Sequence, residues 1–386
     1  MAKTQKKRKY TKKRKAAVTL PLFVVILIIA LIVTLYILYT LGYLDRWMKP
    51  GTGGDNPGSG SGNGGESIIT DDLQIHFLEL GNNRSGDCTL IKVGNTEVLV
   101  DAGSLRSSAD TIGNYLDKYV TDGKIEYVIA THAHEDHISA FVGSKNVKGI
   151  FERYECGTII DFAQANTTSR VYRDYLAARD AEVEAGAVHY TALQCWYEQD
   201  GAQKSYKLAD DITLNILYQK YYEAKASTEN NYSVCFLLTQ GNNNYLFTGD
   251  LEKSGETSLV ESNDLPHCKL FKAGHHGSAT ASNEVLIDVI QPEIVCVCCC
   301  GGYREYQQKE QADEFPSQAF CDRVTKYTKL IYVTTIYSET AEGNFESLNG
   351  NIVVSSNGGE VKVTCSGSSE PFTESEWYKT YRQKAA

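Results

Sequence analysis

Basic residues are scarce in the greater part of this 386-residue sequence. Residues 66–386 contain 27 lysines and arginines against 46 aspartates and glutamates, which gives this part a net charge of −19. A surface of that sign repels the phosphates of DNA and RNA, so a long nucleic-acid groove is disfavoured. A small anionic substrate would have to be bound by a local site of positive charge.

Charge of either sign is absent from residues 16–44, whereas residues 1–15 carry nine basic residues and no acid. A bilayer core is spanned by about 20 apolar residues in a helix. A cleavable signal peptide has a shorter apolar core. Because basic flanks stay in the cytoplasm, the sequence predicts a single-pass signal anchor at 16–44 in the cell membrane. The same prediction makes the lipid bilayer a partner of the anchor. It places residues 1–15 in the cytoplasm and the remaining chain outside the cytoplasm.

Apolar side chains are also absent from residues 51–65, "GTGGDNPGSGSGNGG", where eight of fifteen residues are glycine. This composition predicts a flexible linker, which we place at 45–66. The match of residues 60–65 to G-x-G-x-x-G lacks a preceding strand and a following helix, so it predicts no dinucleotide site. We expect one large domain at 67–368, followed by a polar C-terminal tail at 369–386.

The eleven cysteines are an odd number, although an exported chain would normally pair them. All six residues at 295–300, "VCVCCC", are apolar, which is typical of a buried strand in which cysteine acts as a small hydrophobe. We favour this interpretation over a redox or metal-binding role for Cys296–Cys300.

Strands and helices alternate along the domain. Apolar runs bounded by turn residues predict strands, and amphipathic runs that begin with Ser, Thr or Asn predict helices. The expected strands lie at 73–80, 88–93, 96–103, 125–132, 232–240, 244–250, 267–274, 293–300, 329–338 and 350–365, the last a hairpin; the expected helices lie at 107–120, 167–185, 282–290 and 317–328. This order predicts a mixed α/β fold in which helices cover strand-rich sheets.

A dense group of metal-binding residue types, "HAHEDH" at 132–137, follows the strand expected at 125–132. At a period of two, His132 and His134 point the same way and can share one metal ion. Asp136 and His137 fall in the next turn and can hold a second ion. Imidazole and carboxylate ligands suit Zn²⁺, and also Mn²⁺ or Fe. The H-E-x-x-H pattern does not apply, because one residue separates Glu135 from His137.

The "HAHEDH" motif resembles the H-x-H-x-D-H signature of the metallo-β-lactamase superfamily. Four more stretches agree in order and context: "YLFTGD" ending at Asp250, "LFKAGHHGSATAS" at 270–282, "GNNRSGDCTLIKVGNTEVLVDAGS" at 81–104 and "ENNYSVCFLL" at 229–238. Together they are similar to the hydrolase domain of ComEC-type competence proteins and its free-standing relatives. The resemblance covers about residues 72–365.

The resemblance implies a four-layer αββα sandwich behind the membrane helix, with two divalent metal ions at one edge, Zn²⁺ being favoured and Mn²⁺ the alternative. It implies that His132 and His134 hold site one, that Asp136, His137 and His276 hold site two, and that Asp250 bridges the two ions. Adjacent histidines on an extended segment point in opposite directions, so we expect His276 to ligate and His275 to face the substrate. Asp136, Asp250 and His275 carry the expected catalytic roles.

Further residues have weaker assignments. Asp101, in "LVDAG", is expected to orient a ligand histidine. Asn230 and Ser233 belong to the Asn-x-x-Ser motif, and Tyr303 and Arg304 follow the "VCVCCCGG" strand, so all four are candidates for contact with substrate. His189 is the remaining candidate for site one, against a structural role that is commoner for a strand histidine.

The chain departs from the ComEC-type pattern at one point that bears on activity. Phe315-Pro316 stands where that subfamily tends to carry His-Pro, which weakens a direct transfer of nuclease activity. The sequence therefore predicts a membrane-anchored, extracytoplasmic metal-dependent hydrolase, with a small or cell-surface phosphodiester as substrate and a metal-bridging hydroxide as nucleophile. The alternatives are hydrolysis of a β-lactam or thioester at the same two metals, a nuclease linked to DNA uptake, and a non-catalytic binding domain.

Overall fold

The computed structural model describes residues 73–305 and 308–383. The basic segment at 1–15, the anchor predicted at 16–44 and the linker predicted at 45–66 lie outside these residues. Within the described part, no helix is both long and apolar enough to cross a membrane.

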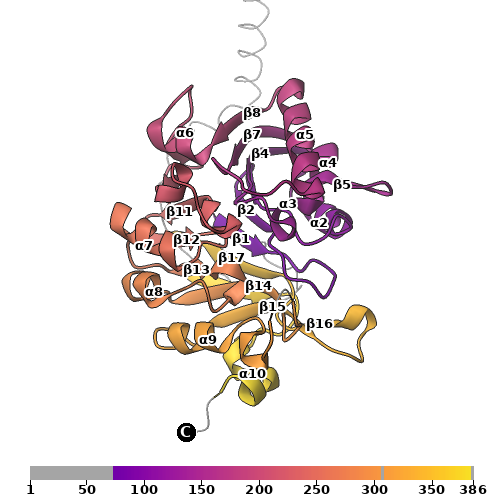
Figure 1. Ribbon diagram of the computed structural model, residues 1–386, viewed down its shortest axis with the longest axis vertical. Coiled ribbons are helices and arrows are strands. Elements are labelled where there is room, and N and C mark those ends of the chain that lie inside the picture. The colour runs from indigo at the N-terminus through magenta and orange to yellow at the C-terminus, as the bar shows by residue number, and fades with distance from the viewer. Residues whose placement is uncertain (1–72, 306–307, 384–386) are drawn as a thin grey trace, which may run out of the picture. The chain divides into compact units, whose positions relative to one another are not determined.

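Two large sheets form the centre of the described domain, each with eight strands among the described residues (Figure 1). The first sheet has the order β18 (Val361–Cys365), β17 (Ile352–Ser356), β1 (Leu73–Phe77), β2 (Thr89–Val93), β3 (Thr96–Val100), β4 (Lys124–Ile129), β7 (Glu155–Asp161), β8 (Val188–Thr191). The second has the order β16 (Phe345–Ser347), β15 (Ile331–Tyr337), β14 (Ile294–Gly301), β13 (Leu270–Lys272), β12 (Asn243–Phe247), β11 (Cys235–Gln240), β10 (Ile212–Leu217), β9 (Ser205–Lys207).

Each sheet contains a parallel half and an antiparallel half. The parallel pairs are β3 with β4, β4 with β7 and β7 with β8 in the first sheet, and β12 with β13, β13 with β14 and β14 with β15 in the second. A short ribbon of β5 (Gly143–Ser144) and β6 (Val147–Lys148) stands apart from both sheets.

Helices connect the parallel strands, as crossover connections require. The α-helices are α2 (Ser108–Leu116), α3 (Glu135–Val142), α4 (Ile150–Arg153), α5 (Arg170–Ala185), α6 (Ala192–Tyr197), α7 (Lys253–Ser262), α8 (Glu284–Ile290), α9 (Gln318–Val324) and α10 (Glu376–Tyr381). Short 3-10 turns are η1 (Lys220–Tyr222), η2 (Glu229–Tyr232), η3 (Gly274–Gly277), η4 (Gln311–Asp313), η5 (Glu342–Asn344) and η6 (Phe372–Glu374).

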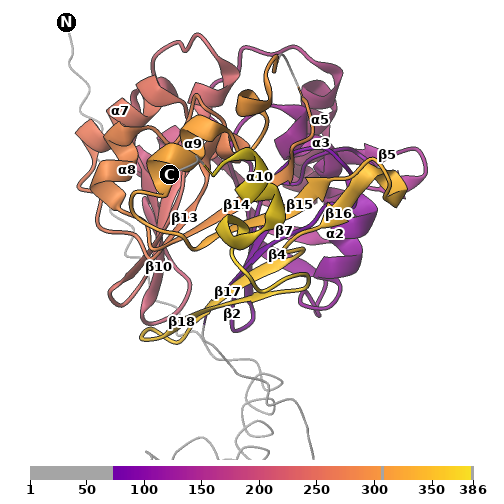
Figure 2. The same ribbon diagram turned by 90° about the horizontal axis from the view of Figure 1, so that it is seen from below.

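The alternation of side chains along the strands divides the core in two. On β11, Phe236 belongs to the core between the sheets, where its ring stacks on Phe247 with centroids 4.6 Å apart. The next residue, Leu237, belongs to a second core under α7, α8 and α9. Helices α2, α3 and α5 cover the first sheet, and α7–α9 cover the second, on opposite sides of the sheets (Figure 2). The predicted mixed α/β sheet sandwich is confirmed.

The cysteine-rich run forms β14, whose eight residues are all buried. Cys296 and Cys298 face the core between the sheets, and Cys299 faces the second core. All eleven cysteines lie in the described part of the chain and none is paired there. The interpretation of "VCVCCC" as a buried strand is confirmed.

Residues 369–383, expected from their polarity to form a tail outside the domain, pack against it in the structure. Phe372 is buried in the second core, and Trp377 packs against the same cluster. The Arg382 guanidinium donates hydrogen bonds to the carbonyl oxygens of Pro316 and Glu314, at 2.7 and 2.8 Å. Two aromatic side chains and one buried arginine thus attach a segment whose average composition is polar.

Candidate metal centre

Histidines and carboxylates from both sheets meet at one edge of the sandwich. Strands β3, β4, β12 and β13 end there, and the residues that follow each strand end supply the polar side chains. They are Asp101 after β3, His132 and His134 after β4, Asp136 and His137 in the first turn of α3, Asp250 after β12, and His275 and His276 in η3 after β13.

His132 and His134 form one group. The distance between His132 Nε2 and His134 Nδ1 is 3.0 Å, and His132 Nε2 lies 3.9 Å from Asp250 Oδ2. The other ring nitrogen of His132 faces the hydroxyl of Thr131 at 3.2 Å. Burial, followed by the neighbouring His137, holds the pKa of His132 well below its usual range. The neutral imidazole is the form that binds a metal ion, so this pair can hold one.

Asp136, His137 and His276 form a second group around the same aspartate. His137 Nε2 and His276 Nε2 lie 3.1 and 3.5 Å from Asp250 Oδ2, and His276 Nε2 lies 3.3 Å from Asp136 Oδ2. Because one oxygen of Asp250 is within 4 Å of histidines in both groups, this carboxylate lies between them. The arrangement brings together all six residues for which the resemblance implies ligand roles.

Several atoms at this centre are buried without a hydrogen bond to any described residue. They are both carboxylate oxygens of Asp250 and the Nε2 atoms of His137 and His276. A buried polar atom without a hydrogen-bond partner costs about 1–3 kcal/mol, and natural proteins tolerate such atoms when an ion satisfies them. Carboxylate oxygens and imidazole nitrogens that converge in this way fit a divalent metal.

The pKa shifts of the second group indicate that its carboxylates stabilise positive charge on the neighbouring side chains. Burial opposes protonation of His276, but Asp250 and Asp87 outweigh it and raise its pKa to about 10. Burial also opposes protonation of His137, and Asp250 and Asp101 raise its pKa well above its usual range. Burial disfavours the charged form of Asp250, yet the neighbouring histidines hold its pKa well below its usual range. Without metal, protons on two histidines supply the positive charge that an ion would supply.

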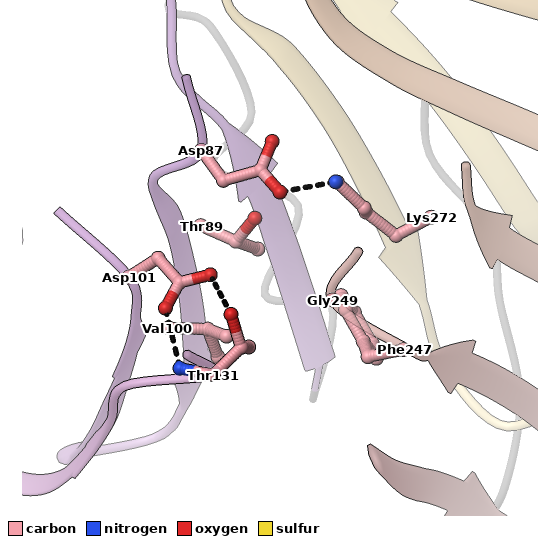
Figure 3. A pocket seen from close by; sticks show the side chains of 8 residues that line it. All are labelled: Asp87, Thr89, Val100, Asp101, Thr131, Phe247, Gly249 and Lys272. Atoms are coloured by element: carbon pink, nitrogen blue, oxygen red, sulfur yellow. Dashed lines mark hydrogen bonds and ion pairs between the residues drawn. The ribbon is translucent and has the colours of Figure 1, made fainter. Parts of the chain in front are cut away.

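Asp101 orients His137. Its Oδ2 accepts a hydrogen bond from the Thr131 hydroxyl at 2.8 Å, and its Oδ1 accepts one from the Thr131 amide at 2.7 Å (Figure 3). The same Oδ2 lies 2.7 Å from His137 Nδ1. A carboxylate at Nδ1 keeps the proton there and leaves Nε2 for a metal. For His276 the carbonyl oxygen of Cys298, 3.0 Å from Nδ1, has the same effect.

The sequence motifs assign no role to Asp87, although it lies within the stretch at 81–104 that resembles the ComEC-type hydrolase domain. It is buried and forms an ion pair with Lys272, which is buried too (Figure 3). Asp87, His137, Asp250 and His276 offer ligand atoms within 4.8 Å of one another. However, Asp87 lies on the Nδ1 side of the rings, 3.4 Å from His276 and 3.8 Å from His137. Because its charge is paired with Lys272, we interpret Asp87 as a support for these histidines.

The His275–His276 segment is not extended, and the expectation that the two rings point in opposite directions is wrong. Both residues adopt left-handed backbone conformations, with φ of 46° and 54°. This turn directs both Nε2 atoms toward Asp250 Oδ2, at 4.0 Å for His275 and 3.5 Å for His276. His275 Nδ1 lies 3.1 Å from the Thr280 hydroxyl. His275 is therefore beside the metal centre and partly exposed.

The remaining candidates have different neighbours. Ser233 accepts a hydrogen bond from the Asp250 amide at 3.0 Å, and Asn230 Nδ2 lies 3.4 Å from His275 Nδ1, so both adjoin the centre. His189 instead bonds through Nε2 to Asp161, at 2.8 Å. Tyr303 lies under the Arg84 guanidinium, 5.4 Å from the ring centroid, and Arg304 pairs with Glu314 at 2.9 Å. The Phe315 ring lies 5.8 Å from His275 and 5.9 Å from His276.

A family model described as "Metallo-beta-lactamase superfamily" matches residues 81–150, which include Asp87, Asp101 and the 132–137 cluster. This part of the chain is therefore similar to the metallo-beta-lactamase superfamily. Members of this superfamily are generally metal-dependent hydrolases, and the Asp/His cluster is a candidate site for divalent metal in this domain.

Two curated relatives match part of this chain. ComE operon protein 3 of Bacillus subtilis (strain 168) is 29% identical over 124 residues, which cover 31% of this chain and 16% of that protein. Recombination protein 2 of Haemophilus influenzae is 25% identical over 118 residues, which cover 31% of this chain and 14% of that protein. The chain thus matches 14–16% of the length of these relatives, and the resemblance to ComEC-type proteins is confirmed.

Among solved structures, the metallo-beta-lactamase fold protein YhfI from Bacillus subtilis is similar over 71% of this chain and 99% of that one, with 15% identity and a TM-score of 0.38. Human tRNase Z, short form, is similar over 68% of this chain and 92% of that one, with 15% identity and a TM-score of 0.31.

Proposed function

We propose that this protein is a membrane-anchored, extracytoplasmic phosphodiesterase that depends on two divalent metal ions. The observation that supports it is the buried carboxylate of Asp250, whose two oxygens accept no hydrogen bond from a described residue and lie between two groups of histidines. A structural carboxylate in that position would be expensive to bury. A carboxylate shared by two ions would not be.

The chain's own residues divide the work. His132 and His134 would hold one ion, Asp136, His137 and His276 would hold the other, and Asp250 would contact both. Two ions bound in this way would lower the pKa of a water molecule and neutralise charge on a substrate phosphate. Zn²⁺ fits this mixed imidazole and carboxylate set, and Mn²⁺ is the alternative.

His275 is placed for a separate task. Its Nε2 lies 4.0 Å from Asp250 Oδ2, while its Nδ1 contacts the Thr280 hydroxyl and the Asn230 amide. Burial lowers its pKa, which favours the neutral ring. A neutral imidazole held at this point can donate a hydrogen bond to a substrate oxygen.

A phosphodiester suits the site because it carries one negative charge and fits between a cationic centre and an acidic domain. The full-length protein, purified in detergent and loaded with Zn²⁺ or Mn²⁺, should hydrolyse bis-p-nitrophenyl phosphate and lose this activity on chelation. Nitrocefin, a thioester and single-stranded DNA serve as substrates for the other hydrolase classes. The rate of bis-p-nitrophenyl phosphate hydrolysis must exceed the rates on these three substrates. Fully metal-loaded protein that cleaves only nitrocefin or the thioester would overturn the proposal.

The membrane placement rests on residues 16–44 and is tested separately. In intact cells, an external protease should release the domain by cutting within residues 45–66. Protection of the domain until the membrane is lysed would show that the orientation is reversed.

A further inference from the structure

An open groove lies beside His275, at the start of α7. Its volume is about 610 Å³, which lies in the range of about 300–1,000 Å³ for small-molecule sites. Its lining is dominated by hydroxyl and amide side chains, and its two charged residues are Glu252 and Lys253. The hydroxyl side chains are Ser227, Ser254, Thr257 and Thr280.

The groove adjoins the candidate metal centre, because two of its lining residues contact His275. Thr280 Oγ1 and Glu252 Oε1 lie 3.1 and 3.8 Å from His275 Nδ1. The opposite nitrogen of His275 lies 4.0 Å from Asp250 Oδ2. One imidazole therefore separates the bridging carboxylate from the groove. A substrate whose phosphate sits at the metals would extend one of its ester groups into the groove.

Glu252 is held in place before any ligand arrives. Its Oε1 accepts a hydrogen bond from Asn230 Nδ2 at 3.2 Å, and its Oε2 accepts one from the Thr228 hydroxyl at 3.1 Å. Each carboxylate oxygen can accept a further hydrogen bond. A fixed acceptor of this kind, beside several hydroxyls, can bind donors on a ligand without first being ordered.

The residue types that line the groove favour a ligand that is rich in hydroxyl groups. None of the lining residues, all of which the structure describes, is aromatic, whereas binding of a nucleobase relies on stacking against aromatic rings. The charges of Glu252 and Lys253 cancel, so the lining suits a neutral group. Hydroxyl and amide side chains donate and accept hydrogen bonds, as the hydroxyls of a polyol or sugar do.

We propose that this groove binds a polyol or sugar group esterified to the phosphate, so that the substrate is a polyol or glycosyl phosphodiester and not a nucleic acid. This proposal rests on the proposed phosphodiesterase function. Hydrolysis of such a diester consumes one water and yields a phosphomonoester and the free polyol. The P–O bond to the polyol breaks, and the proton on the polyol oxygen comes from that water.

The test compares three diesters on metal-loaded full-length protein: glycerophosphoglycerol, the dinucleotide thymidylyl-thymidine and bis-p-nitrophenyl phosphate. Thr257→Trp fills the groove, and Ser262→Trp places the same side chain elsewhere on α7, at an exposed position outside the lining. For Thr257→Trp, kcat/KM for glycerophosphoglycerol relative to bis-p-nitrophenyl phosphate should fall about tenfold, equivalent to about 1.4 kcal/mol. For Ser262→Trp the ratio should not change.

Three outcomes overturn the inference: an unchanged ratio in Thr257→Trp, an equal fall in both variants, or a wild type that prefers the dinucleotide. Failure of the proposed function has a different signature, since the metal-loaded wild type would then cleave none of the three diesters. Calorimetric binding of glycerophosphoglycerol would in that case decide about the groove alone. Thr257→Trp must weaken binding about tenfold, and equal binding by both variants would refute the inference.

Discussion

Two buried aspartates of this domain follow or end a strand and contact histidine, yet their surroundings differ. Asp161, at the end of β7, accepts hydrogen bonds from Arg179 at 2.9 Å and Tyr175 at 3.3 Å, and bonds to His189 at 2.8 Å. Asp250, after β12, lies among histidines without a hydrogen bond to either oxygen from the described residues. The chain itself supplies hydrogen-bond donors to Asp161, whereas Asp250 lies among histidine nitrogens in an arrangement that fits a divalent metal.

This difference separates a structural histidine from a metal ligand where residue type does not. His189 has its Nε2 bonded to Asp161, whereas His137 has its Nδ1 bonded to Asp101 and directs its Nε2 toward Asp250. The family resemblance makes both histidines candidate ligands. The two histidines differ in the carboxylate that they contact: Asp161 accepts hydrogen bonds from Arg179 and Tyr175 as well, whereas Asp250 has no such donors among the described residues.

Asp250→Asn should have the largest effect. It keeps the shape of the side chain but removes the charge shared by the two histidine groups, so we expect a folded protein with less bound metal. Phosphodiesterase turnover should fall on the order of 10²-fold or more, the range for loss of a charge-stabilising group. Metal content and bis-p-nitrophenyl phosphate hydrolysis check this. Asp161→Asn is the matched control and should keep its metal. Full metal content and activity in Asp250→Asn would refute the dinuclear site.

Asp101→Asn should come next. Asp101 accepts bonds from the Thr131 amide, the Thr131 hydroxyl and His137 Nδ1, and an amide has only one acceptor oxygen. One donor must then face the NH₂ group. We expect metal affinity to fall about 10–100-fold, as for other groups that orient ligands, measured by competition with a chelating dye. An unchanged affinity would show that Asp101 does not orient His137.

Metal removal should separate the two clusters within one protein. On chelation, backbone amides at 131–138 and 274–277 should exchange hydrogen faster, because the buried Asp250 oxygens and histidine nitrogens lose their partner. Amides at 158–161 and 188–191, around the self-paired Asp161, should keep their protection. Hydrogen exchange read by mass spectrometry resolves these peptides. A uniform change across all four segments would mean that the metal stabilises the whole fold and not one site.

His189→Ala should have the smallest effect on metal and turnover, both staying within about twofold of wild type, because His189 bonds to Asp161 Oδ1 and contacts none of the proposed ligands in the described residues. Unfolding free energy should drop by about 1–3 kcal/mol for the lost buried hydrogen bond, measured by urea denaturation. A loss of metal in this variant would place His189 at site one after all.

The mixed α/β sandwich, the buried β14 and the clustering of His132–His137 with Asp250 and His276 could be predicted, because each follows from a local pattern or a motif. The Asp87–Lys272 pair could not, since its partners are 185 residues apart in the chain. Nor could the shape of the His275–His276 turn, because left-handed conformations are uncommon for residues other than glycine and nothing adjacent in the sequence requires them.

The packing of residues 369–383 against the domain affects the order in which parts of the site form during synthesis. Phe315 lies against both histidines of η3, and the loop that carries it is held by Arg382 through the carbonyl oxygens of Gln311, Glu314 and Pro316. During synthesis, residues 72–281 already contain every proposed metal ligand. The loop that carries Phe315 beside His275 and His276 nevertheless lacks the hydrogen bonds from Arg382 until residue 382 has left the ribosome. A chain that stops at residue 368 would carry every ligand and still present this histidine pair against an unsupported loop.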